Sequence, residues 1–275
     1  MRPINLSIWY LATGLTVSIL RAAPLCPPLP PNVESAGHIL TVIGTWRLKS
    51  MPQAELQAGC QLAPGAEITP PSPFATGYAK IAILERSGNL RARTCNANED
   101  CAPPLFMPNN PVPRQGIWAS LVEEIMRKLR SDPDTFVSAI TLGDGQLNDA
   151  IVQQSAAGID FSRVLRGLAP GKYELEFTRL VKLPWDGNTV KVDPSTLGTG
   201  LYQVHLKGHD SRDAAWVLIV RSGPSADEVT KGEVELRAVM SSWTDNADIE
   251  RRNARRTLYR AFLAQAAEKS NAPGQ

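Results

Sequence analysis

The residues of this chain best placed for covalent chemistry are four cysteines, and their spacing predicts disulfide bonds. Cys95 and Cys101 enclose a short polar loop, Asn96–Asp100, which a local bridge closes easily. In the chain-entropy account, closing so short a loop stabilises the folded chain by about 2–2.5 kcal/mol. Cys26 and Cys60 are the second candidate pair, which requires the N-terminal segment to fold back. Sequence alone leaves the connectivity open among three pairings.

Two histidines are spaced as a metal-ligand pair would be, but their setting argues against one. His205 lies in an expected strand, and His209 lies in the turn that follows it at Gly208. Because no helix presents both rings on one face, ordinary histidines at a strand end explain the pair better than metal ligands. The spacing of Cys95 and Cys101 also differs from that of zinc ligands. We therefore expect neither a metal site nor a cofactor.

The sequence contains no motif of nucleophilic or nucleotide chemistry. The patterns G-x-S-x-G, S-x-x-K, H-E-x-x-H and G-x-G-x-x-G do not occur, and neither does a Walker loop. Carboxylates near expected turns include Asp160, Asp186 and Asp193, but nothing pairs them as glycoside hydrolysis requires. The sequence therefore favours a non-catalytic protein, assigns no catalytic residue, and leaves an enzyme as the alternative.

A cluster of arginines near the C-terminus is the strongest concentration of charge. Within it, Arg252, Arg256 and Arg260 recur every four residues, which places them in one row of an expected helix. The row is either a solvated helix face or a docking surface for a partner, so these three residues are the partner-binding candidates. We expect no nucleic-acid partner, because the net charge is only +2 and the chain carries an export pattern.

The first 23 residues form that export pattern. Arg2 precedes the uncharged apolar run Leu6–Leu20, and the small residues Ala22 and Ala23 follow Arg21. As a helix the run extends about 22 Å, against about 30 Å of bilayer hydrocarbon. The cleavage site matches the signal-peptide pattern poorly, so residues 1–23 are either a signal peptide or an uncleaved N-terminal anchor. Both place the protein outside the cytoplasm, periplasmic or otherwise extracytoplasmic, where disulfides persist. Membrane contact is expected only through this segment if it is uncleaved.

Composition and turn signals predict short strands along most of the chain. Twenty-two prolines and 20 glycines are many for 275 residues. Residues 24–36 read as a proline-rich linker, and residues 37–108 as a small β domain. Within this domain, Tyr78–Leu84 and Leu90–Thr94 are expected to form a hairpin around Ser87–Gly88–Asn89.

The order of these pieces resembles a FecR-like domain, a small all-β module found outside the inner membrane of bacteria. The matching elements are Gly44–Thr45–Trp46, the turns at Gly59 and Pro64–Gly65, and the apolar strand that runs into Ser87–Gly88–Asn89. The resemblance implies a fold and a compartment, not a signalling activity.

Residues 109–131 are expected to contain a linker and one amphipathic helix that bridges two β units. Its apolar residues recur at helical spacing and are Trp118, Leu121, Val122, Ile125, Met126 and Leu129.

Residues 132–223 are expected to form an antiparallel β-sandwich. The predicted strands are Phe136–Leu142, Ala150–Gln153, Tyr173–Phe177, Gly200–Leu206 and Ala214–Val220. Leu168, Pro170, Gly171 and Tyr173 resemble the corner of immunoglobulin-like and fibronectin-like sandwiches.

Residues 224–275 are expected to form a helical hairpin and tail, with helices ending near Trp243 and Lys269. The predicted fold class is thus mainly β with added α: a small β domain, a bridging helix, an antiparallel β-sandwich and a C-terminal helical hairpin. We expect an exported, non-catalytic binding or interaction module of the bacterial cell envelope, with a protein partner. The alternatives are an extracytoplasmic hydrolase with its site at the junction of the β modules, and an anchored accessory subunit of an envelope complex.

Overall fold

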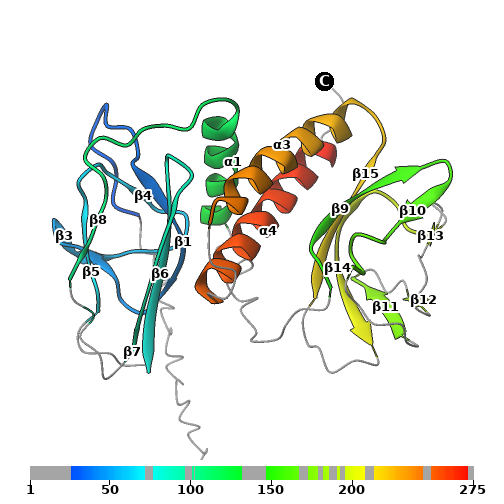
Figure 1. Ribbon diagram of the computed structural model, residues 1–275, viewed down its shortest axis with the longest axis horizontal. Coiled ribbons are helices and arrows are strands. Elements are labelled where there is room, and N and C mark those ends of the chain that lie inside the picture. The colour runs from blue at the N-terminus through cyan, green and yellow to red at the C-terminus, as the bar shows by residue number, and fades with distance from the viewer. Residues whose placement is uncertain are drawn as a thin grey trace, which may run out of the picture.

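Two β units flank a layer of helices in the computed structural model of the chain, and three helices of this layer lie among the described residues (Figure 1). No helix in the described part of the chain has the length and apolarity needed to cross a membrane. The structure describes residues 26–71, 77–96, 101, 103–131, 147–166, 173–178, 182–185, 191–192, 196–207, 214–243 and 249–271.

The predicted fold class, mainly β with added helices and several antiparallel sheets, is confirmed. The predicted export segment and the predicted strand Phe136–Leu142 lie outside the described residues, as do Leu168, Pro170 and Gly171 of the expected sandwich corner.

The first β unit consists of two four-stranded antiparallel sheets. The first sheet has the order β4-β1-β6-β7, with β4 Gln61–Leu62, β1 Gly37–Ile43, β6 Tyr78–Glu85 and β7 Leu90–Asn96. The second has the order β3-β2-β5-β8, with β3 Met51–Glu55, β2 Arg47–Leu48, β5 Glu67–Thr69 and β8 Leu105–Phe106. Both sheets contribute to one apolar core that contains the buried Trp46, Ile68 and Ile81.

Both candidate disulfides are present in this unit. Cys26 is bonded to Cys60, so the proline-rich linker folds back onto the β unit. Cys95, at the end of β7, is bonded to Cys101. These bonds indicate an oxidising, extracytoplasmic environment.

The predicted hairpin is confirmed as β6 and β7, and its turn contacts the helix layer. Gly88 has a φ of +91°, which favours glycine, and a Cβ there would lie 3.2 Å from Val239 Cγ1. The indole nitrogen of Trp243 donates a hydrogen bond to the Gly88 carbonyl at 2.8 Å. The turn is therefore fixed against the end of the C-terminal hairpin's first helix.

The described part of the second β unit forms a seven-stranded sheet with the order β12-β11-β14-β15-β9-β10-β13. The strands are β9 Ala150–Ser155, β10 Gly158–Asp160, β11 Tyr173–Phe177, β12 Lys182–Trp185, β13 Lys191–Val192, β14 Gly200–Lys207 and β15 Ala215–Arg221. The sheet curls around one core, because Ile159 and Val192 near one edge share a cluster with Leu175 and Phe177 near the other.

The antiparallel pairing expected for residues 132–223 holds for every strand pair described in this sheet except one. Strands β15 and β9 are parallel, with Leu218 opposite Ile151. The reason is the order of the strands along the chain. One side of β9 pairs with β10, which follows it directly as a hairpin. The other side pairs with β15, a strand that comes much later in the chain, after β14. Strand periodicity identifies which residues share a face, but it does not identify the neighbouring strand.

The middle layer contains α1 Trp118–Ser131, α3 Pro224–Ser241 and α4 Ile249–Asn271. The six apolar residues predicted for the bridging helix are the buried residues of α1, so that prediction is confirmed. The two helices predicted for the tail correspond to α3 and α4.

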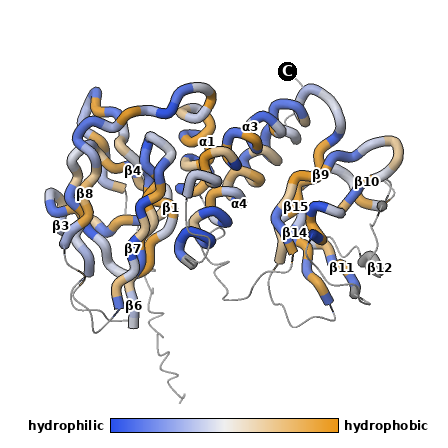
Figure 2. The backbone as a smooth tube through the Cα atoms, viewed as in Figure 1, coloured by the Kyte–Doolittle hydropathy of each residue, from blue (hydrophilic) through white to orange (hydrophobic). Residues whose placement is uncertain are grey.

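One apolar core joins the helices to a sheet on each side. Leu84 of β6 and Leu218 of β15 belong to it together with Phe262 of α4. Neighbouring side chains such as Ile83 and Ile219 face the cores on the opposite sides of their sheets. Burial on both faces explains why β6 and β15 read as nearly continuous apolar runs, and Figure 2 shows the hydrophobic character of β9 and β15.

Two valines of α3 provide a matched test of this layer. Val239 is fully buried, whereas Val234 is 63% exposed. We expect Val239→Ala to lower the free energy of unfolding by about 2 kcal/mol, since it removes buried apolar contacts. Val234→Ala should leave it unchanged or slightly raised, because alanine has the higher helix propensity. Chemical denaturation of both variants measures the difference, and equal losses would contradict the three-layer packing.

Candidate functional site

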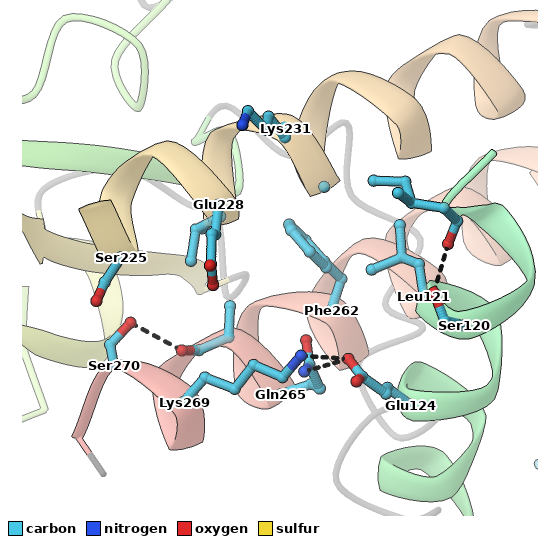
Figure 3. Close-up of a pocket in the computed structure, with 14 residues that line it drawn as sticks. Ser120, Leu121, Glu124, Ser225, Glu228, Lys231, Phe262, Gln265, Lys269 and Ser270 are labelled. Carbon is cyan, nitrogen blue, oxygen red and sulfur yellow. Dashed lines mark hydrogen bonds and ion pairs between the residues drawn. The ribbon is translucent and has the colours of Figure 1, made fainter. Parts of the chain in front are cut away.

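A pocket of about 310 Å³ lies where the three helices meet (Figure 3). This volume is at the lower end of the range found for small-molecule sites. It is lined by Ile117, Ser120, Leu121, Glu124, Ser225, Glu228, Val229, Lys231, Gly232, Phe262, Gln265, Ala266, Lys269 and Ser270.

The floor of the pocket is apolar. Leu121, Val229, Phe262 and Ala266 are buried members of the helix-layer core, and each also lines the pocket. Gly232 adds no side chain, and a Cβ there would lie 3.1 Å from the Phe262 ring. The glycine therefore lets this ring lie close against α3, which keeps the floor continuous.

In one wall of the pocket, an acidic side chain is paired with a basic one. The carboxylate of Glu124 accepts hydrogen bonds from Gln265 Nε2 at 2.8 Å and from Lys269 Nζ at 2.6 Å. Gln265 is itself buried. The bonds join α1 to α4, so this wall is held in place by groups that already satisfy one another.

The opposite end of the pocket carries a second carboxylate, and this one has no basic partner among the described residues. Glu228 on α3 directs its carboxylate into the space between α3 and α4, near Ser225 and Ser270 (Figure 3). Within the described residues, no ion pair or hydrogen bond engages this carboxylate. Lys231 extends along the outer side of α3 in the same view. Glu228 is therefore the acidic group available to a ligand.

The lining residues do not form a nucleophilic constellation. Histidine, cysteine and tyrosine are absent among the described residues that line the pocket. Two of its hydroxyls donate to backbone carbonyls, Ser120 to Ile117 at 2.9 Å and Ser270 to Ala266 at 2.9 Å.

A second surface feature adjoins the pocket. Six large apolar side chains in the described chain are exposed: Met51, Tyr78, Phe106, Val112, Ile117 and Val234. Three of these lie on two neighbouring segments, residues 112–117 and α3, which Arg114 and Glu235 join by an ion pair at 2.9 Å. We call Val112, Ile117 and Val234 the apolar face. Ile117 belongs to this face and to the pocket.

The structure corrects the sequence interpretation of the arginine row. Arg260 is only 2% exposed, and its guanidinium contacts the Asp149 carboxylate at 2.9 Å and the Ala214 carbonyl at 2.5 Å. Arg256 also donates to Ala214 and lies 3.6 Å from Asp149. The helix was expected to have one solvated face, but α4 lies between two sheets and two helices. Of the three arginines, only Arg252 remains exposed.

A second interior cluster, centred on Glu233, was not expected from the sequence. Its Oε1 accepts hydrogen bonds from the Tyr259 hydroxyl at 2.6 Å, Arg237 at 2.8 Å and Arg163 at 3.1 Å. Burial, together with the charge of Glu233, raises the pKa of Tyr259 above its ordinary value, so the phenol stays protonated and donates. The available sequence signal was the spacing of Glu233 and Arg237 by four residues, which indicates a helix pair and not a buried cluster.

The remaining candidates lie apart from the pocket. His205 is exposed on β14, and His209 lies outside the described residues. The described residues contain no group of three or more histidine, cysteine or acidic side chains that could hold a metal ion. The two disulfides lie in the first β unit.

Comparisons with protein-family models, with curated proteins and with solved structures found no match to this chain.

The Asp149–Arg260 pair gives a test of the interior assignment. Arg260→Ala leaves a buried carboxylate without its main partner, and we expect it to lower the free energy of unfolding by about 3–5 kcal/mol. Arg252→Ala removes the same charge from the exposed part of the helix and should cost less than about 1 kcal/mol. Urea denaturation distinguishes the two variants. Similar small losses would show that the row is solvated after all.

Proposed function

We propose that the chain is an extracytoplasmic, non-catalytic interaction module of the bacterial cell envelope, and that a protein partner docks on the apolar face. The observation that carries this proposal is the exposure of Val112, Ile117 and Val234 on two segments that an ion pair holds together. Scattered single apolar side chains are common on protein surfaces, but grouped ones mark interaction sites.

Three further observations support the compartment and the class. The sequence pattern of residues 1–23 is that of an export segment, and both disulfides suit an oxidising compartment. The FecR-like resemblance of residues 37–108 agrees with a location outside the inner membrane. The absence of a paired nucleophile and base among the described pocket residues favours binding over hydrolysis.

A second candidate function is that of an anchored accessory subunit in a larger envelope complex. Val234 on α3 and Ile117 beside it favour this candidate, since grouped exposed apolar side chains at the tail helices suit a subunit contact. In this form residues 1–23 stay attached, and they join the first β unit directly at Cys26, which is bonded to Cys60.

Site-specific photo-crosslinking tests the docking surface. A photoreactive residue at position 117 or 234 should capture one defined protein in the cells that produce the chain. The control is position 106, because Phe106 is 52% exposed, similar to Ile117 at 50%, but lies in the sheet remote from the helices.

The substitution Ile117→Asp should reduce the crosslinked product at position 234 at least about tenfold, because a buried charge at an interface costs several kcal/mol. Capture of the same protein with equal yield at position 106 would contradict the proposal. So would turnover of a substrate by the purified chain with no specific crosslink.

A further inference from the structure

The helix pocket has a ligand preference that is separate from partner docking. We infer that it binds a small organic amine, an apolar chain or ring that ends in a protonated ammonium group. The inference uses the floor, the charged groups and the helix ends of this pocket. It does not depend on the proposed protein partner, although Ile117 contributes to both surfaces.

The apolar floor requires an apolar body in the ligand. Phe262, Leu121, Val229 and Ala266 present a buried surface that water contacts poorly. A ligand gains about 0.8 kcal/mol for each methylene it buries, which corresponds to about a fourfold change in affinity per methylene. A volume of about 310 Å³ accommodates a short chain or a single ring.

The charge at one end selects a cation. Of the four charged side chains that line the pocket, Glu124 and Lys269 pair with each other at 2.6 Å. Lys231 extends along the outer side of α3. Glu228 is left with its carboxylate directed inward and, within the described residues, without a partner. The oxygens of Ser225 and Ser270 lie at the same end and provide further acceptors for an ammonium group (Figure 3).

The ends of the helices do not reverse this preference. The N-terminus of α3 favours anions and the C-terminus of α4 favours cations, and Ser225 and Ser270 place these two ends beside the same pocket. Two opposite partial charges at one place largely offset each other. Asp227 in the first turn of α3 reduces the positive end further. The full charge of Glu228 therefore decides the sign of the ligand.

Titration of the full chain, with both disulfides formed, against three six-carbon probes tests this inference. The probes are n-hexylammonium, n-hexanol and n-hexanoate, followed by calorimetry or by chemical-shift changes at Gly232 and Phe262. We expect hexylammonium to bind at least about tenfold more tightly than hexanoate, with hexanol between them. Replacing hexylammonium by n-butylammonium should weaken binding about tenfold or more, because two fewer methylenes are buried.

Two neighbouring substitutions separate a specific contact from a general effect of charge. Glu228→Gln should weaken hexylammonium binding about tenfold and leave hexanol binding unchanged. Asp227→Asn removes the same charge one residue away, on a side chain that does not line the pocket, and should change binding less than about twofold. Both side chains are exposed, so both variants are expected to fold, and thermal unfolding checks this.

Tighter binding of hexanoate than of hexylammonium would overturn the inference, as would equal effects of the two substitutions. Neither result depends on whether photo-crosslinking at positions 117 and 234 finds a protein partner. The two proposals can therefore fail separately.

Discussion

The structure depends on the enclosure of α4. This helix contacts a β-sheet on each side and the two other helices, and the stretch Thr257–Ala267 is buried without interruption. Such a helix needs small and apolar side chains on most faces, and each polar side chain that it buries needs a partner. Alanine at positions 261, 264 and 266 provides the close approach, and Asp149 provides the partner for Arg260. Without α4, much of the apolar surface that the two β units bury against the helix layer would be exposed.

The buried polar contacts also determine which residues of α4 face each neighbour. Arg256 and Arg260 are held against the seven-stranded sheet by Asp149, and Tyr259 is held against α3 by Glu233. Buried ion pairs add little net stability compared with apolar packing, but breaking one is costly. We infer that these contacts specify the rotation of the helix. With that rotation, Phe262 and Gln265 form the pocket side of the same helix.

Local patterns predicted the elements of the chain well and their arrangement less well. Helix α1 buries one face, so its apolar spacing was sufficient to identify all six of its buried residues. Helix α4 buries every face over much of its length, and the amphipathic interpretation therefore assigned Arg260 to solvent wrongly. Strand β15 was identified from its apolar run. Its parallel neighbour β9 was not identified, because the run reports burial and not pairing.

The pocket could not be predicted from sequence for a related reason: its walls come from distant parts of the chain. Glu124 and Gln265, which form one wall, are 141 positions apart. Nothing in the local sequence of either residue signals the contact. The shape of the pocket nevertheless depends on the buried polar contacts of α4. Phe262, which lines the pocket, lies less than one helical turn from Arg260 and Tyr259 on this helix. A rotation of α4 by one residue, about 100°, would turn Phe262 away from the floor of the pocket. It would also leave Arg260 in apolar surroundings without its partner Asp149. The Asp149 and Glu233 clusters therefore maintain the floor of the pocket, although neither Asp149 nor Glu233 lines it.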